Sequence, residues 1–202
     1  MNAHQPYGKR NCLNNLRSTF ESDPDPKRTI RSLSLDMEDL ADQLELGSKF
    51  YVIGYSMVHR LAGVALIAPV VNYWWSSFPR NLSMAAYKLQ PRQDQWAVGV
   101  VPWLDYSRQQ GLAESIFRDM RVGFGKWEFD PMEIENPFPN NEGSVHLWHG
   151  DEDGLVPVSL QRYIAKKLPW IHCHELPGVG HLLPNYNGNK EAILKSLLIG
   201  EY

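Results

Sequence analysis

The sequence has few cysteines, no long apolar run and no excess of charge of one sign. Its 202 residues contain two cysteines, Cys12 and Cys173, too few for a disulfide framework and not in metal-site spacing. The longest apolar stretch, over 62–71, is broken by Gly63 and Pro69 and is too short to cross a bilayer. With 20 basic and 23 acidic residues, no basic field favours nucleic acid as a partner. We therefore expect a soluble cytoplasmic protein with no membrane span.

The first 29 residues are polar, and they contain no apolar stretch that could form a strand or a secretory signal. Pro24 and Pro26 each disfavour the helical conformation in the residue before them. Beyond this segment, apolar residues recur at helical spacing, and Gly47 is placed where glycine often ends a helix. We therefore expect an irregular segment over 1–29 and an amphipathic helix over 30–46.

Two short apolar runs have the composition of buried strands, two later segments are predicted as further strands, and two more have the pattern of helices. The predicted strands are 50–54, 63–69, 144–148 and 171–176, and the predicted helices are 159–168 and 190–199. Strands that alternate with helices are typical of an α/β fold with a mostly parallel sheet. The stretch of about 72–140 is rich in tryptophan, proline and asparagine, with a weak helical pattern around 112–120. We expect it to be a cap-like insertion.

Three polar residues each follow the carboxyl end of a predicted strand by a few positions. They are Ser56, Asp153 and His181. Because the carboxyl ends of parallel strands meet at one edge of a sheet, such residues are placed where open α/β sheets bind ligands. Their order along the chain is that of a hydrolase triad whose serine lies on a strand-to-helix turn. In such a triad His181 takes the proton from Ser56, while Asp153 orients the imidazole and stabilises its cation.

Asp151 and Asp153 follow the same predicted strand, and either carboxylate could approach His181. We choose Asp153 because the chain has cleared the strand end there, and because Gly154 allows it to turn sharply towards the next helix. We expect the carboxylate of Asp153 to lie closer to the imidazole than that of Asp151. The connection after the serine is short, so we expect Ser56 to lie farther from His181 than a working triad requires.

At these residues the chain resembles the α/β-hydrolases, and in particular a group of plant α/β-hydrolases. The resemblance covers about 21–202 and is carried by the stretches SDPDPKRT, NPFPNNEGSVHLW, GDEDGLVP and G-x-GH. It implies an eight-stranded core with a cap over the site. In this chain we expect an α/β-hydrolase domain over 30–202 that lacks the N-terminal strands of the sheet and has a shortened cap. The resemblance also implies a serine hydrolase that acts on a small ester or acyl substrate through Ser56, Asp153 and His181, with no cofactor.

The sequence departs from the family pattern at the nucleophile elbow, in the oxyanion hole and in the short cap. Val58 stands where the G-x-S-x-G elbow has its last glycine. Only the eight residues 55–62 separate the first two predicted strands, whereas a parallel crossover usually takes a dozen or more. No strand or His-Gly pair precedes Ser56, so the Met57 N–H is the expected oxyanion donor. The loss of one donor costs about 2.7–4 kcal/mol of transition-state stabilisation.

These departures support a second hypothesis, in which the chain is a non-catalytic shortened form. Such a form would bind a ligand or a partner, or would not fold stably. The missing strands leave a sheet edge without a cover, and uncovered apolar edges favour association. We therefore expect the chain to self-associate or to aggregate.

Histidines and aromatic residues form two further groups of interest. His146, His172 and His174 lie on neighbouring predicted strands, but they lack further ligands at metal spacing, so we expect no metal site. The stretch Tyr73-Trp74-Trp75 follows a predicted strand. It would either line an acyl pocket or pack the cap against the core, and the sequence does not decide between the two.

Overall fold

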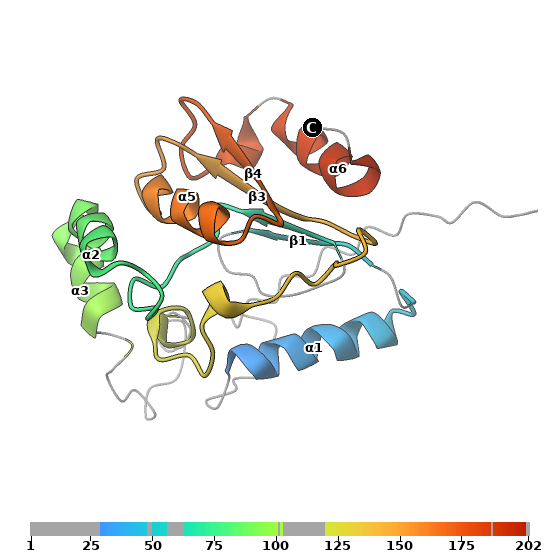
Figure 1. Cartoon of the computed structure of the whole chain (residues 1–202), viewed down its shortest axis with the longest axis horizontal. Helices are drawn as coiled ribbons and strands as arrows, with labels where there is room; N and C mark the ends of the chain where they lie inside the picture. Colours follow the sequence, from blue (N-terminus) through green and yellow to red (C-terminus); the bar gives the residue numbers. More distant parts are fainter. Residues whose placement is uncertain are drawn as a thin grey trace, which may run out of the picture.

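The computed structural model describes residues 29–47, 50–55, 63–100, 102, 120–186 and 188–200. In this part of the chain a parallel sheet of four strands, in the order β1-β2-β3-β4, lies between helices (Figure 1). The strands are β1 (Val52–Tyr55), β2 (Val64–Ile67), β3 (Val145–Gly150) and β4 (Ile171–Leu176). The helices are α1 (Ile30–Gln43), α2 (Arg80–Leu89), α3 (Arg92–Val100), α5 (Val158–Lys167) and α6 (Asn189–Ile199), with two short 3-10 helices at Pro131–Glu133 and Leu183–Asn185. Residues 120–124 are also helical. The predicted α/β class with a parallel sheet is confirmed.

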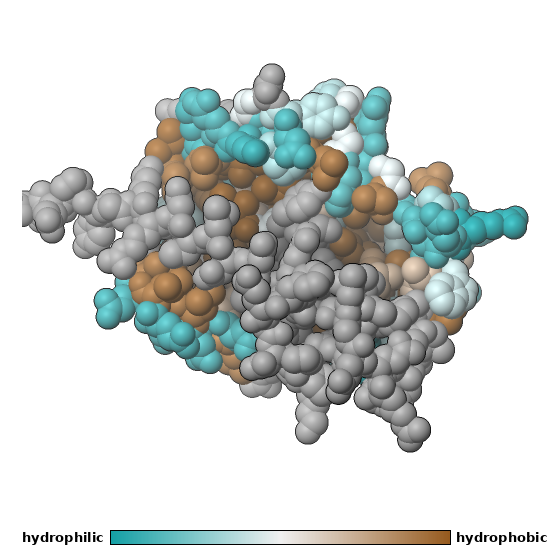
Figure 2. Space-filling view, turned by 180° about the vertical axis from the view of Figure 1, so that it is seen from behind, coloured by the Kyte–Doolittle hydropathy of each residue, from teal (hydrophilic) through white to brown (hydrophobic). Residues whose placement is uncertain are grey.

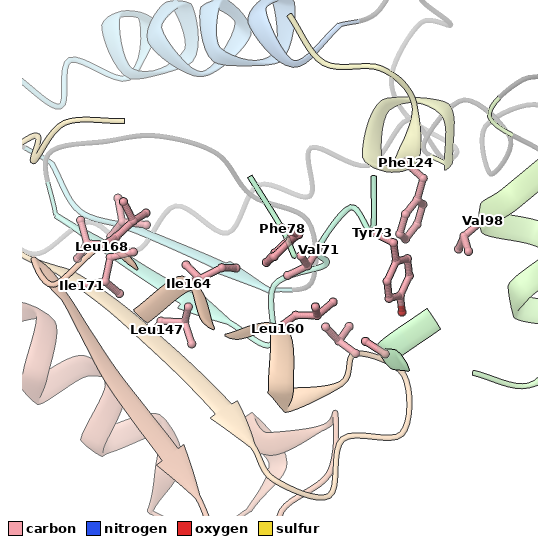
Figure 3. Close-up of a cluster of buried hydrophobic side chains, with 14 of the residues drawn as sticks. Val71, Tyr73, Phe78, Val98, Phe124, Leu147, Leu160, Ile164, Leu168 and Ile171 are labelled. Atoms are coloured by element: carbon pink, nitrogen blue, oxygen red, sulfur yellow. The ribbon is translucent and has the colours of Figure 1, made fainter. Parts of the chain in front are cut away.

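One face of the sheet packs against α5. Side chains alternate between the faces of a strand, and the register places Val145 beside Val64 on one neighbour and beside Ile171 on the other. These residues share a buried cluster with Leu160 and Ile164 of α5. Figure 3 shows Leu147, Ile164, Leu168 and Ile171 at one end of the cluster and Tyr73, Phe124 and Val98 at the other. The core therefore extends from the sheet to the segment after β2.

The opposite face of the sheet is covered by α6, which lies above the strands in Figure 1. Ala65 and Trp148 of the strands are buried together with Ile193 and Leu197 of the helix. Because α5 and α6 cover opposite faces, the middle strand β3 is buried along its whole length. The burial includes the polar residues of the strand, since His146 and His149 are completely buried.

All four predicted strands are present, and their limits differ from the prediction by no more than two residues at either end. The helices predicted over 159–168 and 190–199 are present as α5 and α6, each displaced by a single residue at its start. None of the helices in the described parts of the chain is both long and apolar enough to cross a membrane.

Helix α1 begins where predicted but ends early. The side chain of Thr29 caps its first turn, and this is the one residue of the predicted irregular segment that the structure describes. The helix stops at Gln43 instead of continuing to residue 46, so its predicted end is wrong. Glu45 and Gly47 have φ angles of 51° and 79°, which are left-handed conformations that end a helix.

Strands β1 and β2 are parallel neighbours, with Val52 aligned to Val64, although few residues connect them. A strand of four residues is about 13 Å long. The eight residues from 56 to 63 can extend over roughly 27 Å. The short connection is therefore compatible with the parallel pairing, although it is shorter than the usual crossover.

The stretch predicted as a cap-like insertion contains two helices that the sequence pattern did not predict. Helix α2 buries the small residues Ser83 and Ala86, and α3 buries Val98, so neither shows a broad apolar stripe. The available signals were Pro79 and Pro91, each of which directly precedes a helix. Figure 1 shows α2 and α3 beyond the carboxyl end of the strands. The weak pattern predicted around 112–120 lies outside the described residues except for its last residue.

Candidate active site

The loops that follow β3 and β4 bring an aspartate and a histidine together. The Nδ1 atom of His181 lies 2.8 Å from Oδ2 of Asp153. Because a carboxylate only accepts hydrogen bonds, His181 donates through Nδ1–H, and the neutral ring then carries its lone pair on Nε2. Asp153 is buried, and the side chain of His181 is 13% exposed. The predicted contact is present, and it gives the imidazole the tautomer that a general base needs.

Backbone donors hold the other oxygen of Asp153. Its Oδ1 accepts the N–H groups of Leu155 and Val156 at 2.8 and 2.9 Å. Burial by itself raises the pKa of this carboxyl, but the hydrogen bonds from His181 and from the two N–H groups outweigh it and lower the pKa. The carboxylate thus stays ionised and makes the turn itself. Gly154 does not adopt a left-handed conformation, so the expectation that its freedom makes the turn is wrong.

Asp151 bonds to a different partner. Its Oδ1 accepts the N–H of Gly178 at 2.7 Å, in the loop that leads to His181. The backbone of Gly178 is left-handed, with a φ of 69°, so this position favours glycine. Asp151 therefore links the two loops, while Asp153 contacts the imidazole, as predicted.

The two loops approach each other most closely at Gly150, the last residue of β3. A Cβ atom at this position would lie 1.9 Å from the carbonyl oxygen of Val179. The next residues continue this contact, since the N–H of Glu152 donates to the same Val179 oxygen at 3.1 Å. A glycine is therefore required where the acid loop and the histidine loop pack backbone against backbone.

His149, which precedes this glycine, is a residue that the sequence analysis missed. It is completely buried, and its Nε2 lies 2.9 Å from the carbonyl oxygen of Val156 and 3.5 Å from Oδ2 of Asp153. Burial lowers its pKa, so the ring is neutral near pH 7. A polar residue inside a buried strand, directly before an acid loop, was the signal that could have found it.

The predicted nucleophile Ser56 lies outside the described residues, as do Met57 and Val58. The structure describes β1 as far as Tyr55, the residue before Ser56. Because the four strands are parallel, the carboxyl end of β1 lies at the same edge of the sheet as those of β3 and β4. The distance between Ser56 and His181 and the oxyanion donor thus stay predictions.

The three histidines considered as metal ligands stack on the α6 side of the sheet. Nδ1 of His146 lies 2.9 Å from Nε2 of His174, and its Nε2 lies 2.9 Å from Oγ of Ser144. The ring of His172 stacks on that of His146 at 5.1 Å. Within the described residues, no group of three or more His, Cys, Asp or Glu side chains could hold a metal ion. Burial, followed by the charges of His174 and His172, lowers the pKa of His146 to about 4.

We expect this cluster to make the fold sensitive to acid. Because the pKa of His146 is lower in the folded chain than its unfolded value of about 6.5, the unfolded state binds more protons as the pH falls below that value. The free energy of unfolding should fall by on the order of 2 kcal/mol between pH 8 and pH 5 from this residue alone. Urea titrations of the wild type and of His146→Gln at several pH values measure the effect. An equally steep pH dependence in the variant would contradict it.

The aromatic residues after β2 mostly pack the core. Tyr73 is 5% exposed and stacks on Phe124 at 6.2 Å, and Trp75 stacks on Phe78 at 5.6 Å. Trp74 is 40% exposed. Of the two alternatives, packing of the cap against the core thus describes Tyr73 and Trp75, whereas Trp74 reaches the surface.

No protein-family model matches the sequence, and no curated protein matches it. Solved structures do resemble the fold. An esterase from a marine microorganism is 13% identical, covers 88% of this chain and 79% of its own, and has a TM-score of 0.50. An alpha/beta hydrolase enzyme from a Medee basin deep-sea metagenome library is also 13% identical, covers 86% of this chain and 72% of its own, and has a TM-score of 0.50. Together with the parallel sheet, these likenesses show that the chain has the fold of the α/β-hydrolase superfamily.

Proposed function

We propose that the chain is a serine hydrolase that acts on a small ester or acyl substrate through Ser56, His181 and Asp153. The observation that carries the proposal is the hydrogen bond of 2.8 Å that the Nδ1–H of His181 donates to the buried carboxylate of Asp153. The predicted serine follows β1, and the end of β1 lies at the same edge of the sheet as this pair. One of the solved structures of similar fold is an esterase, which supports an ester as the substrate.

The proposed reaction has two stages. In the first, Nε2 of His181 takes the proton of Ser56 as Oγ attacks the carbonyl carbon, and Asp153 stabilises the imidazolium that forms. The imidazolium then gives this proton to the departing alcohol, and the acyl group remains on the serine. In the second, His181 takes a proton from water as the water oxygen attacks the acyl carbon. The imidazolium then gives this proton to Oγ of Ser56 as the bond to the acyl group breaks and the carboxylic acid leaves.

The oxyanion of each stage would be bound by the N–H of Met57. A hydrolase with one oxyanion donor fewer than usual loses about 10²–10³ in kcat. We therefore propose a slow enzyme. Activated esters are suitable substrates for measuring its turnover, and irreversible probes are suitable for labelling its serine.

Ser56→Ala tests the proposal. A fluorophosphonate probe is expected to label the wild type and not the variant, and hydrolysis of a short-chain nitrophenyl ester is expected to fall at least about 10³-fold. The matched control is Ser159→Ala on α5, which is expected to keep both the label and the turnover. Ester turnover that persists in Ser56→Ala would contradict the proposal, as would a folded wild type that the probe does not label.

A non-catalytic chain that acts through an interaction surface is the second candidate. In the described part of the chain, β1 pairs only with β2 and therefore forms an edge of the sheet. Tyr51 and Ile53 are 54% and 46% exposed at this edge. Figure 2 shows that apolar side chains also reach the surface between hydrophilic ones on the face it presents. Exposed apolar residues on an edge strand favour pairing with another chain.

Ile53→Lys tests whether this edge mediates self-association. The wild type is expected to sediment as a species larger than a monomer, and the variant is expected to shift towards the monomer because a charge on an edge strand opposes strand pairing. The control is Leu89→Lys, which changes an apolar residue that is 73% exposed on α2. A wild type that is a monodisperse monomer with a cooperative melt would rule the association out.

A further inference from the structure

The Asp153 carboxylate lies between two histidines. On one side, Oδ2 accepts the Nδ1–H of His181 at 2.8 Å. On the other, the same oxygen lies 3.5 Å from Nε2 of His149, whose side chain is 1% exposed. The two rings differ in environment, since His181 lies in a loop and is partly exposed, whereas His149 is fixed in the buried strand β3.

The surroundings of His149 determine its tautomer. Its Nε2 faces two oxygens, the carbonyl of Val156 at 2.9 Å and Oδ2 of Asp153 at 3.5 Å. A lone pair at that position would repel both oxygens, so Nε2 must carry the hydrogen. The Nδ1 atom is buried and has no hydrogen-bond partner. The other tautomer would therefore also leave a buried N–H unsatisfied, which costs about 1–3 kcal/mol.

We propose that His149 is a positioning residue for Asp153, whose Nε2–H holds the acid loop so that Oδ2 of Asp153 points at His181. The N–H donates to the Val156 carbonyl and lies beside the carboxylate, while the Val156 N–H donates to the other carboxylate oxygen. His149 thus fixes from inside the sheet the same turn that Asp153 closes from the loop. The proposal rests on the proposed function, in which Asp153 is the triad acid.

A positioning residue differs from a packing residue in what its loss changes. Without the Nε2–H, the Val156 carbonyl loses its hydrogen-bond donor. The ionised carboxylate of Asp153 loses the partly positive hydrogen that lies beside it on the side of β3. Ionised Asp153 should then be less favoured. The other titratable groups that interact with Asp153 or His149 are His181, Tyr73 and Glu175, and they stay in place.

Two variants and one control test the proposal. His149→Gln keeps a side-chain N–H donor, whereas His149→Met fills similar space without one. The control His172→Met removes a more exposed histidine from β4. NMR on the wild type reports the tautomer of His149 from its ring nitrogens, and carboxyl ¹³C titration reports the midpoint for Asp153 in every protein. Kinetics with a nitrophenyl ester give kcat and KM separately.

We expect the Nε2–H tautomer in the wild type. In His149→Met the Asp153 midpoint should rise by about one pH unit, and kcat should fall about tenfold with KM unchanged. His149→Gln should restore both values, and His172→Met should change neither. A packing role alone would lower the melting temperature of the variants without moving the Asp153 midpoint.

An Nδ1–H tautomer in the wild type would overturn the proposal, and so would equal Asp153 midpoints in all four proteins. The tautomer measurement needs no variant, so it decides even where His149→Met does not fold. Ester turnover that is absent, or that does not depend on Ser56, would overturn the proposed function instead. The tautomer and the Asp153 midpoint would still judge the positioning role of His149.

Discussion

Asp153→Asn is expected to lower kcat/KM for an ester substrate about 10⁴-fold. The asparagine keeps an oxygen that can accept the N–H groups of Leu155 and Val156, so the loop should retain its shape. Its amide NH₂ then faces His181 and favours the tautomer with the hydrogen on Nε2, which cannot take a proton from the serine. The loss should appear in kcat, because the acid does not touch the substrate.

Asp151→Asn is the matched control for this change. Asp151 lies two residues away and bonds the N–H of Gly178 through one oxygen, which an asparagine can replace. We expect its kcat/KM to stay within about threefold of the wild type, because the acceptor is preserved. Steady-state kinetics of the two variants, with circular dichroism to verify the fold, separate the aspartates. Equal losses in both variants would contradict the assignment of Asp153 as the acid.

Gly150→Ala is expected to destabilise the fold by about 3 kcal/mol or more. Its Cβ atom would lie 1.9 Å from the Val179 oxygen and 3.0 Å from that of Gly180, and both are backbone atoms that cannot rotate away. The loop that carries His181 would have to move, which would separate the ring from Asp153. Ester turnover and the probe label on Ser56 should therefore fall together with stability.

Gly154→Ala provides the comparison for this steric effect. A Cβ atom at Gly154 meets nothing within 4 Å, and its backbone is not left-handed, so the change should shift the unfolding free energy by less than about 1 kcal/mol. Urea unfolding curves of both variants give the two values. If Gly150→Ala were as stable as Gly154→Ala, the close packing of the two loops would not exist in solution.

The sequence predicts most of the sheet and part of the site. Strands β1 and β2 are recognisable as short, mostly apolar runs. Strand β3 is recognisable from its apolar residues Val145, Leu147 and Trp148, although it also buries two histidines. Asp153 is separable from Asp151 because their distances from the strand end differ. Helices α2 and α3 escape prediction because their buried residues are small or few.

Other features depend on contacts that the sequence does not show. The contact of His149 with a carbonyl seven residues further on is not visible in a pattern of residue types. The turn after β3 shows the same limit. The sequence suggests Gly154 as its cause, whereas the Asp153 carboxylate makes it by accepting two backbone N–H groups.

The sequential order of the strands divides the candidate site into two parts. The acid–base pair follows β3 and β4, whereas the predicted Ser56 follows β1 and is distant in sequence. Asp153 and His181 lie 28 residues apart on the loops after consecutive strands, so their pairing closes a short segment of chain. Residues 68–144, by contrast, separate β2 from β3. Since the entropy of closing a loop rises only with the logarithm of its length, this separating stretch can gain or lose residues at small cost. An altered cap would thus change what reaches the edge of the sheet, while the C-terminal segment would still assemble the same acid–base pair.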